Sequence, residues 1–339
     1  MITYPFLTSN PTIGITAPSS GVPQALHSMF SLSCERMKEK GFSVIPGETV
    51  WTQHKAKSAS PKKRANELQA MIANENIDII IPPWGGELLI EILEHLDFTK
   101  WTAKWVLGYS DTSVLLLTIT LNTGIATAHG TNFVDLRGEY WDTTTAMWQQ
   151  VLTTKKGESV VQVSSDRYQK EWQHDNPSPC VFHLTKQTAW KHTELSDVHI
   201  EGRLLGGCID VIRHLAGTPF GDVKAFREKH IPAEPVIWYF DNCELTTADL
   251  RRSLLQLKLK LAGWFDNCSG ILFGRSSANK PVDSYTAEDV YRDLASDLHI
   301  PVIYDIDCGH LPPQLTLING AYASVNLEKN KGTVVQYFT

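Results

Sequence analysis

The sequence predicts an α/β protein of two domains, with mostly parallel sheets covered by helices. Three observations favour this class. The chain has 339 residues, more than the ~150 of one typical domain. Short apolar segments of strand character alternate with helical segments in both halves of the chain. Apolar residues make up 42% and charged residues 20%, ordinary values that exclude wholesale disorder.

The first 135 residues predict repeated β-α-β units, and this order implies a parallel sheet. Ser60 and Pro61 mark one helix start, because serine caps helices and proline suits their first position. We expect strands over residues 12–17, 42–45, 78–81, 105–109 and 125–128, and helices ending near residue 40 and spanning 61–73, 87–95 and 111–122.

Residues 137–200 are polar with little periodicity, and we interpret them as an interdomain connection that carries a loop. A second α/β segment follows, with strands over 200–205, 236–240 and 270–273 and near 302, 315 and 334, and helices over 209–215, 246–261 and 287–298. The predicted division is an N-terminal domain (1–165), a linker and substrate loop (166–198) and a C-terminal domain (199–339).

Composition excludes several classes of function. Lys and Arg total 31 and Asp and Glu total 37, a net charge of −6, whereas a nucleic-acid binder needs a basic surface. No apolar run approaches the ~18 residues of a membrane helix, and no signal-peptide pattern is visible. The six scattered cysteines form no C-x-x-C pair, which favours reduced thiols in a cytoplasmic protein. We therefore expect no metal, organic cofactor, membrane or nucleic-acid polymer partner.

The segment around Ser110 carries the strongest chemical signal. An apolar strand ends in Gly108-Tyr-Ser110, and an apolar helix starts at once. This is the arrangement of a nucleophile elbow, which lifts a serine hydroxyl above the sheet and places the next amide, that of Asp111, at a helix N-terminus. Thr112 replaces the usual second glycine, and a plain helix cap at Ser110 or Asp111 is the alternative.

Gly85 and Gly86 follow the strand over 78–81, at the same edge of the predicted sheet as Ser110. Paired glycines let backbone amides approach a ligand closely, so the Gly86 amide is a candidate second oxyanion donor. The alternative is an ordinary tight turn.

A nucleophilic serine also needs a base and a carboxylate that orients it. His310 lies in a rigid, turn-rich loop, Asp307 to Pro313, while His95 and His129 are alternative bases. Asp241 and Glu244 both follow an apolar strand, and either could instead cap the next helix.

Together these motifs resemble the LD-carboxypeptidase family of serine peptidases, which includes the microcin C immunity peptidases. The resemblance extends from Gly14 to Gly320. It rests on Gly85-Gly86, Gly108-Tyr-Ser-Asp-Thr, Glu201-Gly-Arg-Leu-Leu-Gly-Gly, the turn from Asp241 to Glu244, and Gly309-His310 followed by Gln314-Leu-Thr-Leu. It implies a Rossmann-like N-terminal domain, a C-terminal α/β domain and an active site at their junction.

Carried over by position, the resemblance implies a triad of Ser110, Glu244 and His310, with the amides of Gly86 and Asp111 as the oxyanion hole. Trp84 and Glu87 flank the glycine pair, and Cys208 follows Gly206-Gly207, where the family commonly has other residues. These departures affect substrate choice more than mechanism, and Gly85 and Trp84 are taken as substrate-binding residues.

The insert before Glu201 resembles the immunity branch, in which an aromatic side chain stacks on a nucleobase. Trp172 and Trp190 are the candidates, with packing at the domain junction as the alternative. The expected function is a cytoplasmic, homodimeric serine hydrolase that cleaves the link between an aminoacyl or peptidyl group and a nucleotide. The alternatives are a murein tetrapeptide LD-carboxypeptidase that releases D-Ala, and a non-catalytic two-domain protein that binds a small ligand.

Overall fold

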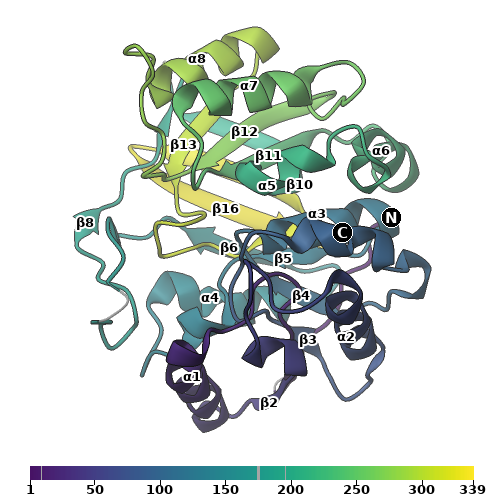
Figure 1. Ribbon diagram of the computed structural model, residues 1–339. Helices are drawn as coiled ribbons and strands as arrows, with labels where there is room; N and C mark the ends of the chain where they lie inside the picture. Colours follow the sequence, from purple (N-terminus) through teal and green to yellow (C-terminus); the bar gives the residue numbers. More distant parts are fainter. Residues whose placement is uncertain (9, 174–175, 195) are drawn as a thin grey trace.

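The computed structural model describes residues 1–8, 10–173, 176–194 and 196–339. These form two large sheets with helices around and between them, and one small two-stranded sheet (Figure 1). The two-domain α/β class predicted from the sequence is confirmed. Among the described residues, no helix is long and apolar enough to cross a membrane.

The first sheet has six strands in the order β14-β5-β4-β3-β1-β2. β1 to β5 pair in parallel, as the β-α-β pattern predicts, and β14 pairs antiparallel with β5. The strands are β1 (Thr12–Ile15), β2 (Ser43–Pro46), β3 (Ile79–Ile80), β4 (Trp105–Gly108), β5 (Thr127–His129) and β14 (Leu317–Asn319).

The second sheet has eight strands in the order β6-β16-β15-β10-β11-β12-β13-β9, and its four strands β10 to β13 are parallel. The register of β10 and β11 sets Cys208 opposite Asp241, where both strands end. The strands are β6 (Ser159–Val163), β9 (Lys191–His192), β10 (Val198–Cys208), β11 (Val236–Asp241), β12 (Cys268–Gly274), β13 (Val302–Ile306), β15 (Tyr322–Glu328) and β16 (Lys331–Tyr337), and β7 (Arg167–Tyr168) pairs separately with β8 (Lys186–Gln187).

Helix α3 joins the two halves of the molecule. It begins directly after the Ser110 turn and contacts β4, β5 and β10, so it lies between the sheets (Figure 1). Residues 112–121 are all buried, as expected of a helix that is apolar on every side. The helices are α1 (His27–Glu39), α2 (Pro61–Ala73), α3 (Thr112–Thr123), α4 (Thr143–Leu152), α5 (Ile209–Ile212), α6 (Val223–His230), α7 (Thr247–Lys258) and α8 (Ala287–Leu298).

The interpretation of residues 137–200 as a connection with little regular structure is wrong in its first part. Asp142 caps helix α4, because its side chain accepts hydrogen bonds from the amides of Thr144 and Thr145. Strand β6 pairs with β16 at the edge of the second sheet. The helix predicted over 87–95 is instead a 3-10 segment, Leu89–His95. The predicted domain boundaries stay a prediction, because β6 and β14 each join the sheet of the other half.

Candidate active site

Ser110 lies in the turn between β4 and α3, at the carboxyl end of the first sheet. Its φ angle is +62°, a left-handed conformation that is unusual for a residue with a side chain. This is the geometry of the predicted nucleophile elbow, because strand, strained turn and helix follow one another without an intervening loop.

His310 reaches Ser110 from the loop that follows β13. The His310 Nε2 atom lies 3.0 Å from the Ser110 hydroxyl, and its Nδ1 atom lies 2.6 Å from Asp241 Oδ2. Asp241 is the last residue of β11 and is fully buried. A hydroxyl, an imidazole and a carboxylate thus form one hydrogen-bonded row between residues from both sheets.

The prediction that Glu244 is the carboxylate beside His310 is wrong, because His310 forms its hydrogen bond with the Asp241 carboxylate. Glu244 lies three residues beyond the end of β11, in an exposed turn whose amides at Cys243 and Glu244 donate to Asp210. Its charge acts on Glu87, whose pKa is raised by burial and by the charges of Glu244 and Asp111.

The charges of the row reinforce each other. Burial alone would lower the pKa of His310, but the attraction of Asp241 and hydrogen bonds with Asp241 and Cys243 raise it to about 10. Burial would likewise raise the pKa of Asp241, yet the two neighbouring histidines, His310 and His129, hold it below its usual range. Each partner of the pair therefore favours the charged form of the other.

His129, considered above as an alternative base, lies behind Asp241 rather than beside Ser110. It is fully buried at the end of β5, with its Nε2 atom 3.6 Å from Asp241 Oδ1 and its Nδ1 atom 3.8 Å from the Cys308 thiol. The other alternative, His95, ends the 3-10 segment after the glycine loop. Of the three histidines, the structure brings His310 to the serine.

The glycine loop packs directly on the nucleophile. A β-carbon on Gly85 would lie 2.6 Å from Ser110 Cβ and 3.0 Å from the Asp111 amide nitrogen, so no larger residue fits there. Gly86 has a φ of +141° and lies against Ser19 and Ser20. No described residue accepts a hydrogen bond from the amides of Gly86 or Asp111.

Asp111 also holds this loop with its side chain, a role that the sequence analysis missed. Its buried Oδ2 atom accepts hydrogen bonds from the Ser19 hydroxyl at 2.5 Å and from the Leu89 amide at 2.8 Å. Fully buried Arg64 adds a second tie, because its guanidinium donates to the carbonyls of Pro18 and Leu88. The backbone around Gly86 is thereby fixed from both sides.

A cavity of about 690 Å³ opens beside His310. Its wall combines aromatic, apolar and polar side chains, as in many small-molecule sites. The lining residues include two predicted substrate-binding residues, Trp84 and Trp172, and Trp172 Nε1 donates to the His310 carbonyl at 2.8 Å. The sequence analysis missed the other polar residues of the wall, which are Tyr109, Asn132, Asp135 and Arg137.

The prediction that Trp190 contacts substrate is wrong. Trp190 is fully buried, packs on Gly332 and donates to Asp307 Oδ2 at 2.8 Å. Asp307 also binds Arg275 and Ser165, and it begins the loop that carries His310. Trp190 therefore supports the histidine loop from the core, which is the packing alternative stated above.

Within the described part of the chain, two sets of three side chains are close enough to share a metal ion: Asp241 with His129 and Cys308, and Asp241 with Cys208 and His310. Burial raises the pKa of both thiols well above the usual value, which disfavours the thiolate that metals bind. Asp241 is moreover paired with His310. Neither set favours a metal centre.

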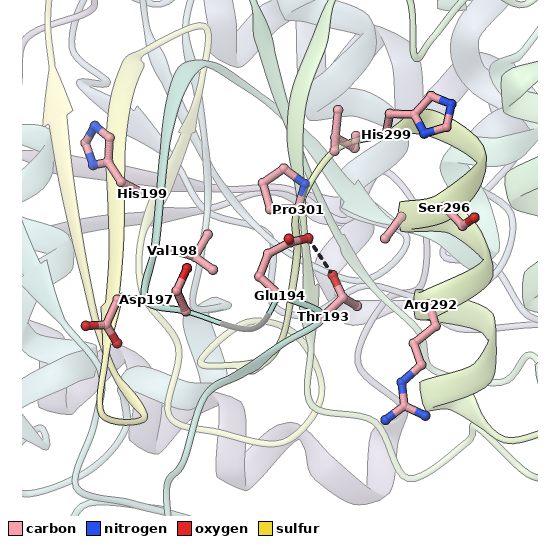
Figure 2. Close-up of a pocket in the computed structure, with 12 residues that line it drawn as sticks. Thr193, Glu194, Asp197, Val198, His199, Arg292, Ser296, His299 and Pro301 are labelled. Carbon is pink, nitrogen blue, oxygen red and sulfur yellow. Dashed lines mark hydrogen bonds between the residues drawn. The ribbon is translucent and has the colours of Figure 1, made fainter.

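A separate cavity of about 530 Å³ lies between residues 193–194 and 196–199 on one side and helix α8 with the residues after it on the other. Figure 2 shows Asp197 and His199 on one side of it and Arg292 and His299 on the other. None of the three residues of the row lines it, so we place the candidate chemistry at the cavity beside His310.

Comparison with known proteins supports the resemblance. Residues 13–130 match the model of the LD-carboxypeptidase N-terminal domain, and residues 201–325 match that of the C-terminal domain. The microcin C7 self-immunity protein MccF of Escherichia coli is 24% identical, with 97% of this chain and 94% of the relative covered. A probable murein peptide carboxypeptidase of Bacillus subtilis is also 24% identical, with 97% and 92% covered.

Solved structures agree on the fold. MccF in complex with glutamyl sulfamoyl guanosine superposes with a TM-score of 0.83 at 21% identity, covering 100% of this chain and 99% of the other. The muramoyltetrapeptide carboxypeptidase of Oxalobacter formigenes gives 0.72 at 23% identity, with 96% and 98% covered. Because the two domain models together match well over half of the sequence, this chain belongs to the LD-carboxypeptidase family.

Proposed function

We propose that this protein is a serine hydrolase in which Ser110 is the nucleophile, His310 the general base and Asp241 the carboxylate that orients the base. The row of hydrogen bonds at 3.0 Å and 2.6 Å carries this proposal. Serine is a weak nucleophile until a neighbouring base takes its proton, and Asp241 stabilises the imidazolium that forms.

In the proposed reaction, His310 takes the proton of the Ser110 hydroxyl as its oxygen attacks the carbonyl carbon of an amide-like bond. The amides of Gly86 and Asp111 hold the oxygen of the tetrahedral intermediate, and the Asp111 amide stands just before the N-terminus of α3. His310 then protonates the leaving group. A water molecule, activated by the same imidazole, releases the acyl group from Ser110.

The proposed substrate joins an aminoacyl or peptidyl group to a nucleotide. Trp84 and Trp172 line the cavity beside His310, and a base stacked on an aromatic ring gains about 1–3 kcal/mol. Structures of the relative MccF hold aspartyl sulfamoyl adenosine and glutamyl sulfamoyl guanosine. The second candidate is a murein tetrapeptide, because carboxypeptidase relatives match this chain at the same identity as MccF.

The deciding experiment incubates the purified protein with aspartyl sulfamoyl adenosine and with a murein tetrapeptide, and follows the products by mass spectrometry. We expect cleavage of the nucleotide compound, and loss of at least about 10⁴-fold in kcat for Ser110→Ala. Ser296→Ala, an exposed position on α8, is the matched control and should keep full activity. Undiminished turnover by Ser110→Ala would contradict the mechanism. Cleavage of the tetrapeptide alone would favour the second candidate.

A further inference from the structure

Arg137 is a buried cation in the wall of the candidate active-site cavity. Arg137 follows the 3-10 segment Phe133–Leu136, which begins shortly after β5. Only 8% of the surface of Arg137 is exposed. It lines the cavity of about 690 Å³ that also contains His310. It also lines an adjoining cavity of about 240 Å³.

The guanidinium of Arg137 has few partners within the protein. Its Nη1 atom donates to the Val134 carbonyl at 2.7 Å, and no other described residue accepts a hydrogen bond from it. No carboxylate of the described residues lies within 4 Å of it, in contrast to Arg64, Arg203 and Arg275. A guanidinium carries five N–H donors, so most of its bonding capacity is unused.

The unused donors of Arg137 are not completely covered by the protein. Buried nitrogens without a partner occur on several other arginines, including Arg64 and Arg275, but none belongs to Arg137. Its Nε and Nη2 atoms therefore remain accessible from the cavities that it lines.

The nearest acidic group is already engaged. Asp135 accepts a hydrogen bond from the Tyr109 hydroxyl and one from the Asn132 amide. Burial raises the pKa of Asp135 to about 6, despite the opposing charge of Arg137. Asp135 thus offsets part of the arginine charge at a distance, and no hydrogen bond joins the two side chains among the described residues.

We propose that Arg137 anchors a carboxylate of the substrate. A buried charge without a partner is costly, and an anion that accepts two parallel N–H bonds removes that cost. Among the described residues that line this cavity, Arg137 is the one arginine or lysine. Its neighbours there include Pro23, Leu26, Met29 and Trp84. The inference rests on the proposed function and narrows it to acyl compounds that carry a negative charge beside an apolar or aromatic portion.

The test measures binding without turnover, by calorimetry on the Ser110→Ala protein. Two ligand pairs each differ by one negative charge: aspartyl against asparaginyl sulfamoyl adenosine, and a murein tetrapeptide with a free against an amidated C-terminus. We expect the acid of at least one pair to bind about tenfold more tightly than its amide. Adding Arg137→Gln should reduce that ratio to nearly one, and Arg137→Lys should restore only part of it, because lysine lacks the planar fork.

Arg252→Gln is the matched control, since Arg252 is a largely exposed arginine on α7 and should leave both ratios unchanged. Equal weakening of acid and amide by Arg137→Gln, or no change in either, would overturn the proposal. If neither pair binds, acetate is the probe, and equal acetate affinity with and without Arg137 would also overturn it. Because turnover is not needed, a wild-type protein that hydrolyses neither substrate would end the proposed function separately.

Discussion

The two halves of the candidate active site differ in how far apart along the chain their residues lie. The serine half, Gly108 to Ser113, is one continuous run of strand, turn and helix in the first sheet. The other half joins Asp241 from β11 to His310 from the loop after β13, residues 69 positions apart in the second sheet. The first half is therefore a local structure, whereas the second exists only once the sheet has formed.

This difference explains where sequence reasoning succeeds. A strained strand-to-helix turn leaves its signal in adjacent residues, so the turn at Ser110 could be predicted from the sequence. A choice between Asp241 and Glu244 depends on which residue still belongs to the strand, and three residues lie within the ordinary uncertainty of element boundaries. Asp241 ends the strand and is buried, while Glu244 lies in the exposed turn that Asp210 holds.

The largest expected effect separates these two carboxylates. We predict that Asp241→Asn lowers kcat by about 10⁴-fold, because an amide orients the imidazole wrongly and cannot stabilise its charge. Glu244→Gln should change kcat by less than about threefold, since its side chain is exposed and its turn is held by backbone amides.

Steady-state kinetics on both variants check this prediction, with circular dichroism to show that each is folded. The reverse order, a severe loss in Glu244→Gln and little change in Asp241→Asn, would contradict the geometry.

A shift in pH dependence comes second. His310 must be neutral to take the serine proton, and its pKa is raised to about 10. The rate constant kcat/KM should therefore rise with pH from 7 towards 10 as the imidazole loses its proton. Removing the Asp241 charge lowers that pKa, so the residual activity of Asp241→Asn should rise at lower pH, nearer the ordinary value of about 6.5. Rate profiles of both proteins measure the shift, and identical rising limbs would show that Asp241 does not act on the base.

The same contrast between local and distant signals holds elsewhere in the chain. The β-α-β order of the first sheet could be predicted because each unit carries its own apolar pattern. β6 alternates exposed and buried residues, and among the described strands it pairs with β16, more than 160 residues later. Its short segment therefore predicts no more than a connection when it is taken alone. Trp172 and Trp190 carry the same side chain in the same polar part of the sequence, so the sequence does not distinguish their roles. Only the folded structure places Trp172 in the cavity wall and Trp190 in the core.

The third prediction concerns the two tryptophans, and its expected effect on activity is smaller. Trp190→Ala should lower the free energy of unfolding by about 3–5 kcal/mol, because it leaves a large hole in the core and removes a donor to Asp307. Trp172→Ala should mainly raise KM for a nucleotide substrate, because the binding free energy loses up to about 3 kcal/mol of base stacking. Urea denaturation and steady-state kinetics on both variants separate the two effects. A Trp190→Ala protein of wild-type stability would contradict its assignment to the core.

The smallest expected effect concerns His129, which links the two halves because it comes from the first sheet and contacts Asp241 of the second. Asp241 Oδ1 has no hydrogen bond from any described residue, and His129 Nε2, at 3.6 Å, is positioned to act on it. We predict that His129→Leu lowers kcat about tenfold with KM unchanged, since losing a long contact to a buried charge costs ~1.4 kcal/mol. His129→Gln, which keeps an N–H donor, should recover part of the loss. A purely structural role would instead lower stability equally in both variants and leave the pH profile of His310 where it is.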